Sequence, residues 1–144
     1  MRKLKLILLT TAMVCATGLA ATAQAALAII AHPSNPASGI TVDEAERIFL
    51  GKTGEMSGGR RVTPVDQSVG SASRAKFLQK VVHKSEDELT AYWSKLMFSG
   101  KGQPPRDLGD DAAVKAFVAG NPDAIGYVDG KFVDGSVKVL LIIP

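Results

Sequence analysis

Residues 121–128, NPDAIGYV, contain a helix end followed directly by a strand, and this order decides the fold class. Asn121 and Pro122 end a stretch with helical spacing of its apolar residues, because proline cannot continue a helix. Ala124 to Val128 is a short apolar run with the composition of a buried strand. A helix that leads straight into an apolar strand is typical of domains in which helices and strands alternate along the chain.

The same alternation extends back along the chain to residue 26. Short apolar runs predict strands at 27–31, 62–65 and 137–143 in addition to 124–128. Capping residues and helical spacing predict helices that begin at Thr41, Ser71, Ser85 and Asp110, and Trp93 lies on the apolar face of the third. The segment SGKGQPPRDLG before the fourth helix is expected to be a long loop. We therefore expect one α/β domain, 26–144, with a small mixed sheet flanked by helices.

The first 25 residues have the pattern of a secretory signal peptide. Three basic residues precede an apolar run at 6–20, and small residues end the segment at Ala25, where we expect cleavage. The apolar run is too short, and too rich in threonine and alanine, to span a membrane comfortably. We therefore expect a secreted or periplasmic protein with no stable membrane insertion after the signal is removed.

The net positive charge of the whole chain comes from that segment. Lys plus Arg number 17 and Asp plus Glu 14, which gives a net charge of +3. Three of the basic residues lie in the signal, so charges balance over 26–144, and the sequence indicates no nucleic-acid partner. The single cysteine, Cys15, also lies in the signal, which excludes a disulfide within the mature domain.

One predicted helix differs from the others in its first turn. The helices that begin near Thr41, Ser85 and Asp110 carry acidic residues there, which neutralise the positive end of the helix dipole. The helix that begins at Ser71 carries none. Its start supplies backbone N–H groups, hydroxyls and a guanidinium, a combination typical of an oxyanion site, from Gly70, Ser71, Ala72, Ser73 and Arg74. The alternative is that Ser71 only caps the helix and Arg74 is a solvated surface residue.

Four stretches, in the same order, resemble the substrate-binding protein of the bacterial phosphate ABC transporter. VGSASRAKFLQKVV, residues 69–82, is similar to that family's Gly-Ser-Gly-Thr-Arg-x-x-Phe helix start. TVDEAERIFLGKT, residues 41–53, is similar to its helix ending in Ile-Phe-Leu-Gly-Lys. RRVTPVDQS, residues 60–68, resembles the strand and loop that follow, and NPDAIGYV resembles its Pro-Gly-Ala-Ile-Gly-Tyr-Val segment. Together these stretches extend over most of residues 26–144.

The resemblance implies one lobe of a type 2 periplasmic binding protein, with phosphate or a similar oxyanion as the ligand. It implies that Ser71 and Ser73 donate hydroxyl and backbone N–H bonds to the oxyanion. It also implies that Arg74 contributes its guanidinium and that Asp66 holds an arginine or the loop in place. Ala72 replaces the family's middle glycine. Family members are much longer and close two lobes around phosphate, so a single open lobe predicts a Kd of roughly millimolar to high micromolar. The implied protein partner is an ABC permease.

A periplasmic protein-interaction module that keeps the fold without ligand uptake is the alternative function. The loop FSGKGQPPRDLG, residues 98–109, displays Lys101 and Arg106, and such a loop would bind another periplasmic protein. An enzyme is not expected, because no nucleophile can be paired with a base. His32 and His83 are too few for a metal cluster, and nothing in the sequence indicates a cofactor.

Overall fold

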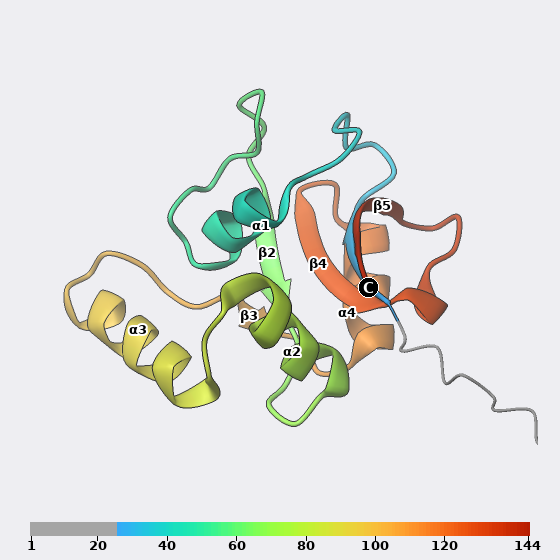
Figure 1. Ribbon diagram of the computed structural model, residues 1–144. Coiled ribbons are helices and arrows are strands. Elements are labelled where there is room, and N and C mark those ends of the chain that lie inside the picture. The colour runs from blue at the N-terminus through green and yellow to red at the C-terminus, as the bar shows by residue number, and fades with distance from the viewer. Residues whose placement is uncertain (1–25) are drawn as a thin grey trace, which may run out of the picture.

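The computed structural model describes residues 26–144 (Figure 1), so the predicted signal peptide and its cleavage site lie outside the described residues. The strands are β1 (Leu27–Ala31), β2 (Thr63–Asp66), β3 (Arg106–Asp107), β4 (Ala124–Asp129) and β5 (Lys138–Ile143). The α-helices are α1 (Val42–Phe49), α2 (Ala72–Phe77), α3 (Glu86–Phe98) and α4 (Asp111–Gly120). A π-helical turn, Leu78–Val82, continues α2, and a 3-10 turn, Gly130–Phe132, follows β4.

The strands form one mixed sheet in the order β3-β2-β4-β1-β5. β2 runs parallel to both β3 and β4, whereas β1 runs antiparallel to both β4 and β5. β2, β4 and β1 therefore have neighbours at both of their edges, and β3 and β5 form the edges of the sheet. The α/β prediction, with a small mixed sheet flanked by helices, is confirmed.

Each face of the sheet is covered by its own apolar cluster. All of β1 is buried, and its side chains alternate between the two faces, as strand geometry requires. Leu27 and Ile29 pack on the side of α1 and α2, together with Phe77 and Tyr127. On the opposite side the residues that pack together are supplied by β1, β2, β4 and α4: Ala28, Ile30, Val65, Val114, Val118, Ala124 and Val128. The sheet is thus the central layer between helices, as Figure 1 shows.

Two segments differ from the sequence-based prediction. The helix expected at 71–82 changes from α-helical to π-helical hydrogen bonding after Phe77 and ends at His83, whose φ of 53° is left-handed. The segment expected to be a long loop after α3 contains β3, which pairs with the end of β2. A strand of this length leaves no periodic signal in the sequence, so only its parallel pairing with β2 identifies it.

Helix α3 lies at the edge of the molecule, away from the sheet (Figure 1). It is attached through its inner face, where Leu89 and Trp93 are buried and the Tyr92 hydroxyl donates to the carbonyl of Leu50 at 2.6 Å. Trp93 belongs to the main apolar cluster, which confirms its predicted role in the core. Among residues 26–144, no helix is both long enough and apolar enough to cross a membrane.

Candidate functional site

The candidate site is the turn that joins the end of β2 to the start of α2. Gly70 has a φ of 95°, a left-handed conformation that favours glycine. Ser71 caps α2, since its Oγ accepts from the N–H of Arg74 at 3.2 Å. The Ser71 N–H donates to the carbonyl of Ser68 at 3.1 Å, which closes the turn. The predicted residues Asp66 and Gly70 to Arg74 are therefore gathered in one short segment.

Gln67, which no sequence pattern singled out, fixes this turn to the rest of the domain. Its side chain is fully buried, and its Nε2 donates to Asp111 Oδ1 at 3.0 Å and to the carbonyl of Tyr127 at 2.9 Å. Its Oε1 accepts from the Ser71 hydroxyl. Gln67 thus ties the turn to both β4 and α4. A buried amide with all these partners is a rigid support, because each bond would be costly to lose in a dry environment.

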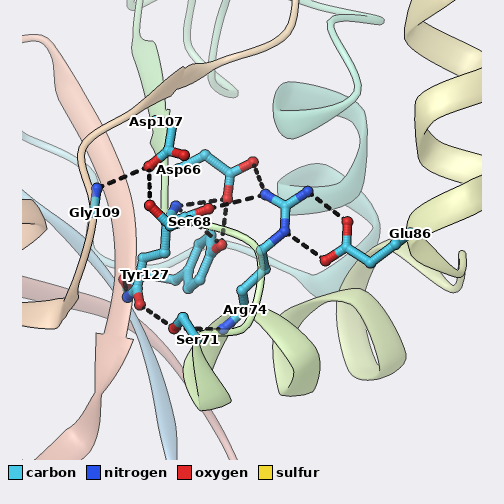
Figure 2. Close-up of polar contacts among 9 residues, drawn as sticks. Asp66, Ser68, Ser71, Arg74, Glu86, Asp107, Gly109 and Tyr127 are labelled. Atoms are coloured by element: carbon cyan, nitrogen blue, oxygen red, sulfur yellow. Dashed lines mark hydrogen bonds and ion pairs between the residues drawn. The ribbon is translucent and has the colours of Figure 1, made fainter.

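Arg74 lies between two carboxylates (Figure 2). Its Nε and Nη2 donate to the two oxygens of Glu86 at 2.7 and 2.9 Å, a bidentate pair. Its Nη1 donates to Asp66 Oδ2 at 2.9 Å and to the carbonyl of Gln67 at 3.0 Å. The sequence indicated a cation that reinforces the open positive end of α2. The structure instead shows a guanidinium whose charge is balanced by Asp66 and Glu86, because the fold brings the first turn of α3 beside it.

These contacts set the protonation of the cluster. The hydrogen bonds from Arg74 hold the pKa of Glu86 below its ordinary value. Arg74 itself stays protonated, because the bond to Glu86 and the charge of Asp66 raise its pKa further. Burial raises the pKa of Tyr127 well above its ordinary value, and the charge of Asp66, to which its hydroxyl donates, acts in the same direction. Tyr127 is therefore a neutral donor at neutral pH.

Both serine hydroxyls of the turn already have acceptors within the protein. The Ser71 hydroxyl donates to Gln67, and the Ser73 hydroxyl donates to Asp111 Oδ1 at 2.6 Å. The N–H groups of Ala72 and Ser73, by contrast, have no acceptor among residues 26–144, as expected for the first turn of a helix. The donors that remain for a ligand are therefore backbone N–H groups, with the hydroxyls available only if they turn away from Gln67 and Asp111.

A small cavity lies beside this first turn. Its volume is about 120 Å³, and its walls come from α2, the start of β1 and the end of β4: Ala26, Leu27, Ala72, Ser73, Lys76 and Asp129. α2 has no acidic residue in its first turn, whereas α1, α3 and α4 each have at least one. The cavity thus meets a helix end whose partial positive charge is not neutralised from within the helix.

The segment after α3 returns to the same turn. Asp107, in β3, accepts at its Oδ1 from the Ser68 hydroxyl and from the N–H of Gly109, both at 2.8 Å (Figure 2). The N–H of Leu108 donates to the carbonyl of Asp66 at 3.0 Å. The predicted display loop is therefore anchored at its far end, while Lys101 before β3 and Arg106 within β3 are both exposed. Within residues 26–144, no group of acidic, histidine or cysteine side chains is arranged to hold a metal ion.

The raised pKa of Tyr127 makes the protein sensitive to alkaline pH. A group whose pKa is raised on folding contributes stability below its unfolded pKa, about 10 for tyrosine, and loses it as pH rises towards the folded pKa. In a Tyr92→Phe background, we expect tyrosinate absorbance to appear only as the chain unfolds. Alkaline spectrophotometric titration alongside circular dichroism measures both events. A tyrosinate that forms near pH 10 in the folded protein would contradict the burial of Tyr127.

The fold is similar to that of solved receptors for phosphate transport. A Clostridium perfringens protein, named as a phosphate ABC transporter substrate-binding protein and solved with bound phosphate, has a TM-score of 0.63 and 25% identity over 81% of this chain and 45% of its own. An ABC-type phosphate transport receptor of Vibrio cholerae has a TM-score of 0.64 and 20% identity over 81% of this chain and 46% of its own. PstS from Borrelia burgdorferi has a TM-score of 0.60 and 15% identity over 81% of this chain and 47% of its own.

The present chain thus spans less than half the length of these receptors. No protein-family model and no curated protein matches the sequence. The resemblance predicted from the sequence is confirmed for the fold, which matches one lobe of periplasmic binding proteins.

Proposed function

We propose that this chain is a solute-binding domain that recognises phosphate or a similar oxyanion at the start of α2. The observation that carries the proposal is the open helix end: α2 has no acidic residue in its first turn, and the N–H groups of Ala72 and Ser73 point to no acceptor within the described chain. The similarity to a receptor solved with bound phosphate supports the choice of ligand. The proposal includes an ABC permease as partner and a secreted or periplasmic location.

In this proposal the backbone forms the main contact with the anion. Oxygens of the ligand accept from the N–H groups of Ala72 and Ser73, and the partial positive charge of the helix end adds to the attraction. Gly70 allows the tight turn that leaves this end accessible. Ser71 and Ser73 join the ligand shell when their hydroxyls rotate away from their internal acceptors.

Arg74 and Asp66 then act mainly as positioning residues. Four of the five guanidinium N–H donors are engaged with Glu86, Asp66 and the carbonyl of Gln67, which leaves one on Nη2. The cluster fixes α2 against α3 and keeps the turn in shape. Such preorganisation favours binding, because the ligand does not have to order the loop.

The affinity is expected to be weak. The cavity walls include a cation, Lys76, but also the carboxylate of Asp129, which opposes an anion. No second lobe covers the site within the described chain, so water competes for the same donors. A Kd of roughly millimolar to high micromolar is expected. Tight capture would require another protein, or another chain, to cover the cavity.

Placing a carboxylate in the first turn of α2 tests this site without disturbing the Arg74 cluster. Ala72 is exposed, and Ala72→Glu gives α2 the acidic first turn that the other helices have. We expect phosphate binding to weaken at least about tenfold, because the new charge repels the anion and neutralises the helix end. Ala72→Gln is the matched neutral control and should bind like the parent.

Isothermal titration calorimetry of phosphate, with sulfate alongside, measures the effect. Thermal melts of both variants show whether the fold is intact, and Ala72→Glu is expected to be at least as stable as Ala72→Gln, because its charge complements the helix dipole. Equal phosphate affinity in the two variants would place the ligand elsewhere. No binding by the parent up to millimolar phosphate would overturn the proposed function.

A further inference from the structure

The outer face of α3 has an unusual composition for an exposed helix. Its centre is formed by Ala91 and Ser94, and its C-terminal end by Phe98. Phe98 is 96% exposed and Met97 is 49% exposed. Ala91, Ser94 and Phe98 recur at spacings of three and four residues, so they share one side of the helix, opposite the buried Leu89. Met97 follows the buried Trp93 by one turn and borders the inner face instead. Phe98 is thus a large apolar ring left in water on this face, and burying it against a partner would be favourable.

The small residues and the large ones occupy different parts of this face. Ala91 and Ser94 at the centre allow another helix to approach closely, since neither side chain extends far from the backbone. Phe98 projects at the end of α3, one turn before the exposed loop that holds Lys101. In a second α3 laid antiparallel across the small centre, the first turn would lie over this ring, and the contact would bury the apolar surface of Phe98.

One flank of this face carries an acidic and a basic residue, which could pair with their counterparts in a second copy of the chain. Glu88 and Lys95 are exposed, and Lys95 follows Glu88 by seven positions, or about two helical turns, so they lie one above the other on the same flank. Within residues 26–144 neither side chain makes an ion pair. The midpoint between them nearly coincides with the midpoint between Ala91 and Ser94. A two-fold axis at that point would place Glu88 of each copy opposite Lys95 of the other.

We propose that the outer face of α3 pairs with the same face of a second copy of this chain. The two helices run antiparallel about a two-fold axis between Ala91 and Ser94, with two Glu88–Lys95 contacts on one flank. Each Phe98 covers the first turns of the opposite α3. Such a contact is isologous and closes on itself, as expected for a symmetric dimer. It is small, so we expect a weak dimer, with a Kd on the order of 10–100 μM.

Reversal of the two charges tests both the partner and the geometry. Glu88→Lys alone places like charges together twice in the dimer, as does Lys95→Glu alone, and each should weaken dimerisation about tenfold or more. The double variant, Glu88→Lys with Lys95→Glu, restores both contacts in the opposite sense and should recover dimerisation. Lys80→Glu changes an exposed charge outside this face and is the matched control.

Sedimentation velocity of the purified protein over a range of concentrations measures the association. Circular dichroism of each variant establishes that α3 remains folded. A dimer that is lost in both single variants and recovered in the double variant supports the proposal. A monomer at all concentrations, or a dimer insensitive to both single charge reversals, would overturn it, and in the second case another face would form the contact. Phosphate titration of the same samples tests the proposed function separately, because none of these substitutions lies at the start of α2.

Discussion

Replacing Arg74 with methionine is expected to lower the free energy of unfolding by about 3 kcal/mol. The guanidinium side chain is only 12% exposed, and that of Asp66 is 13% exposed, so this part of the cluster is nearly removed from water. Methionine fills much of the same volume but leaves both carboxylates without their counter-charge. Removing one partner of a buried pair is costly because the remaining charge is neither solvated nor neutralised.

The double variant Arg74→Met with Asp66→Asn separates this charge effect from lost packing. It removes the cation together with its more buried acidic partner, so no strongly buried charge is left alone. We expect it to be more stable than Arg74→Met by about 1–2 kcal/mol. Urea unfolding monitored by Trp93 fluorescence measures all the variants. A double variant less stable than Arg74→Met would show that Asp66 stabilises the turn mainly through the bonds that its Oδ1 accepts from the Gln67 N–H and the Tyr127 hydroxyl.

The Arg74–Glu86 pair also makes the stability difference between the parent and Arg74→Met depend on pH. Arg74 lowers the pKa of Glu86 in the folded state, so this pair contributes stability above the unfolded pKa of glutamate, about 4.3. That contribution is lost as pH falls through the folded pKa. The stability difference between the parent and Arg74→Met should therefore shrink between about pH 5 and pH 3. A difference that stays constant over this range would exclude the Arg74–Glu86 pair as its source.

The fold could be predicted from the sequence because its signals are local. The apolar run of β1, the capping residues Thr41, Ser85 and Asp110, and the proline after α4 each act within a few residues of their own position. The gathering of Asp66 with Gly70 to Arg74 was predictable for the same reason, since one turn of chain joins them. The resemblance to phosphate-binding proteins added the arrangement of these elements as one lobe.

The surroundings of the site depend on contacts between distant segments, which no local pattern encodes. Glu86 looked like one of several acids that begin α3, and only the packing of α3 beside α2 brings it to Arg74. Gln67 looked like an ordinary loop residue, yet its amide joins the turn to Asp111 and Tyr127. The composition of the turn therefore correctly indicated an open helix end, but it misjudged the charge balance of the arginine.

Gly126→Ala, in the stretch NPDAIGYV, is expected to destabilise the protein by about 2 kcal/mol or more. A Cβ at this position would lie 2.6 Å from Cγ1 of Val114 in α4 and 3.1 Å from Cγ2 of Val65 in β2. Both valines are buried and their χ1 angles are stiff, so neither can turn aside without strain. Gly126 therefore lets α4 pack directly against the middle of the sheet, and the strand itself must shift if it is replaced.

Removing the obstructing side chain should reverse part of this loss. Val114→Ala alone leaves a cavity and is expected to cost about 2 kcal/mol, but it also creates room for the new methyl group. The double variant Gly126→Ala with Val114→Ala should therefore be at least about 1 kcal/mol more stable than the sum of the single effects predicts. Gly120→Ala has open space around its Cβ and serves as the control, with little or no loss. Strict additivity in urea unfolding would mean that α4 moves away from β4 in the single variant, and that the close contact at Gly126 does not determine how the helix packs.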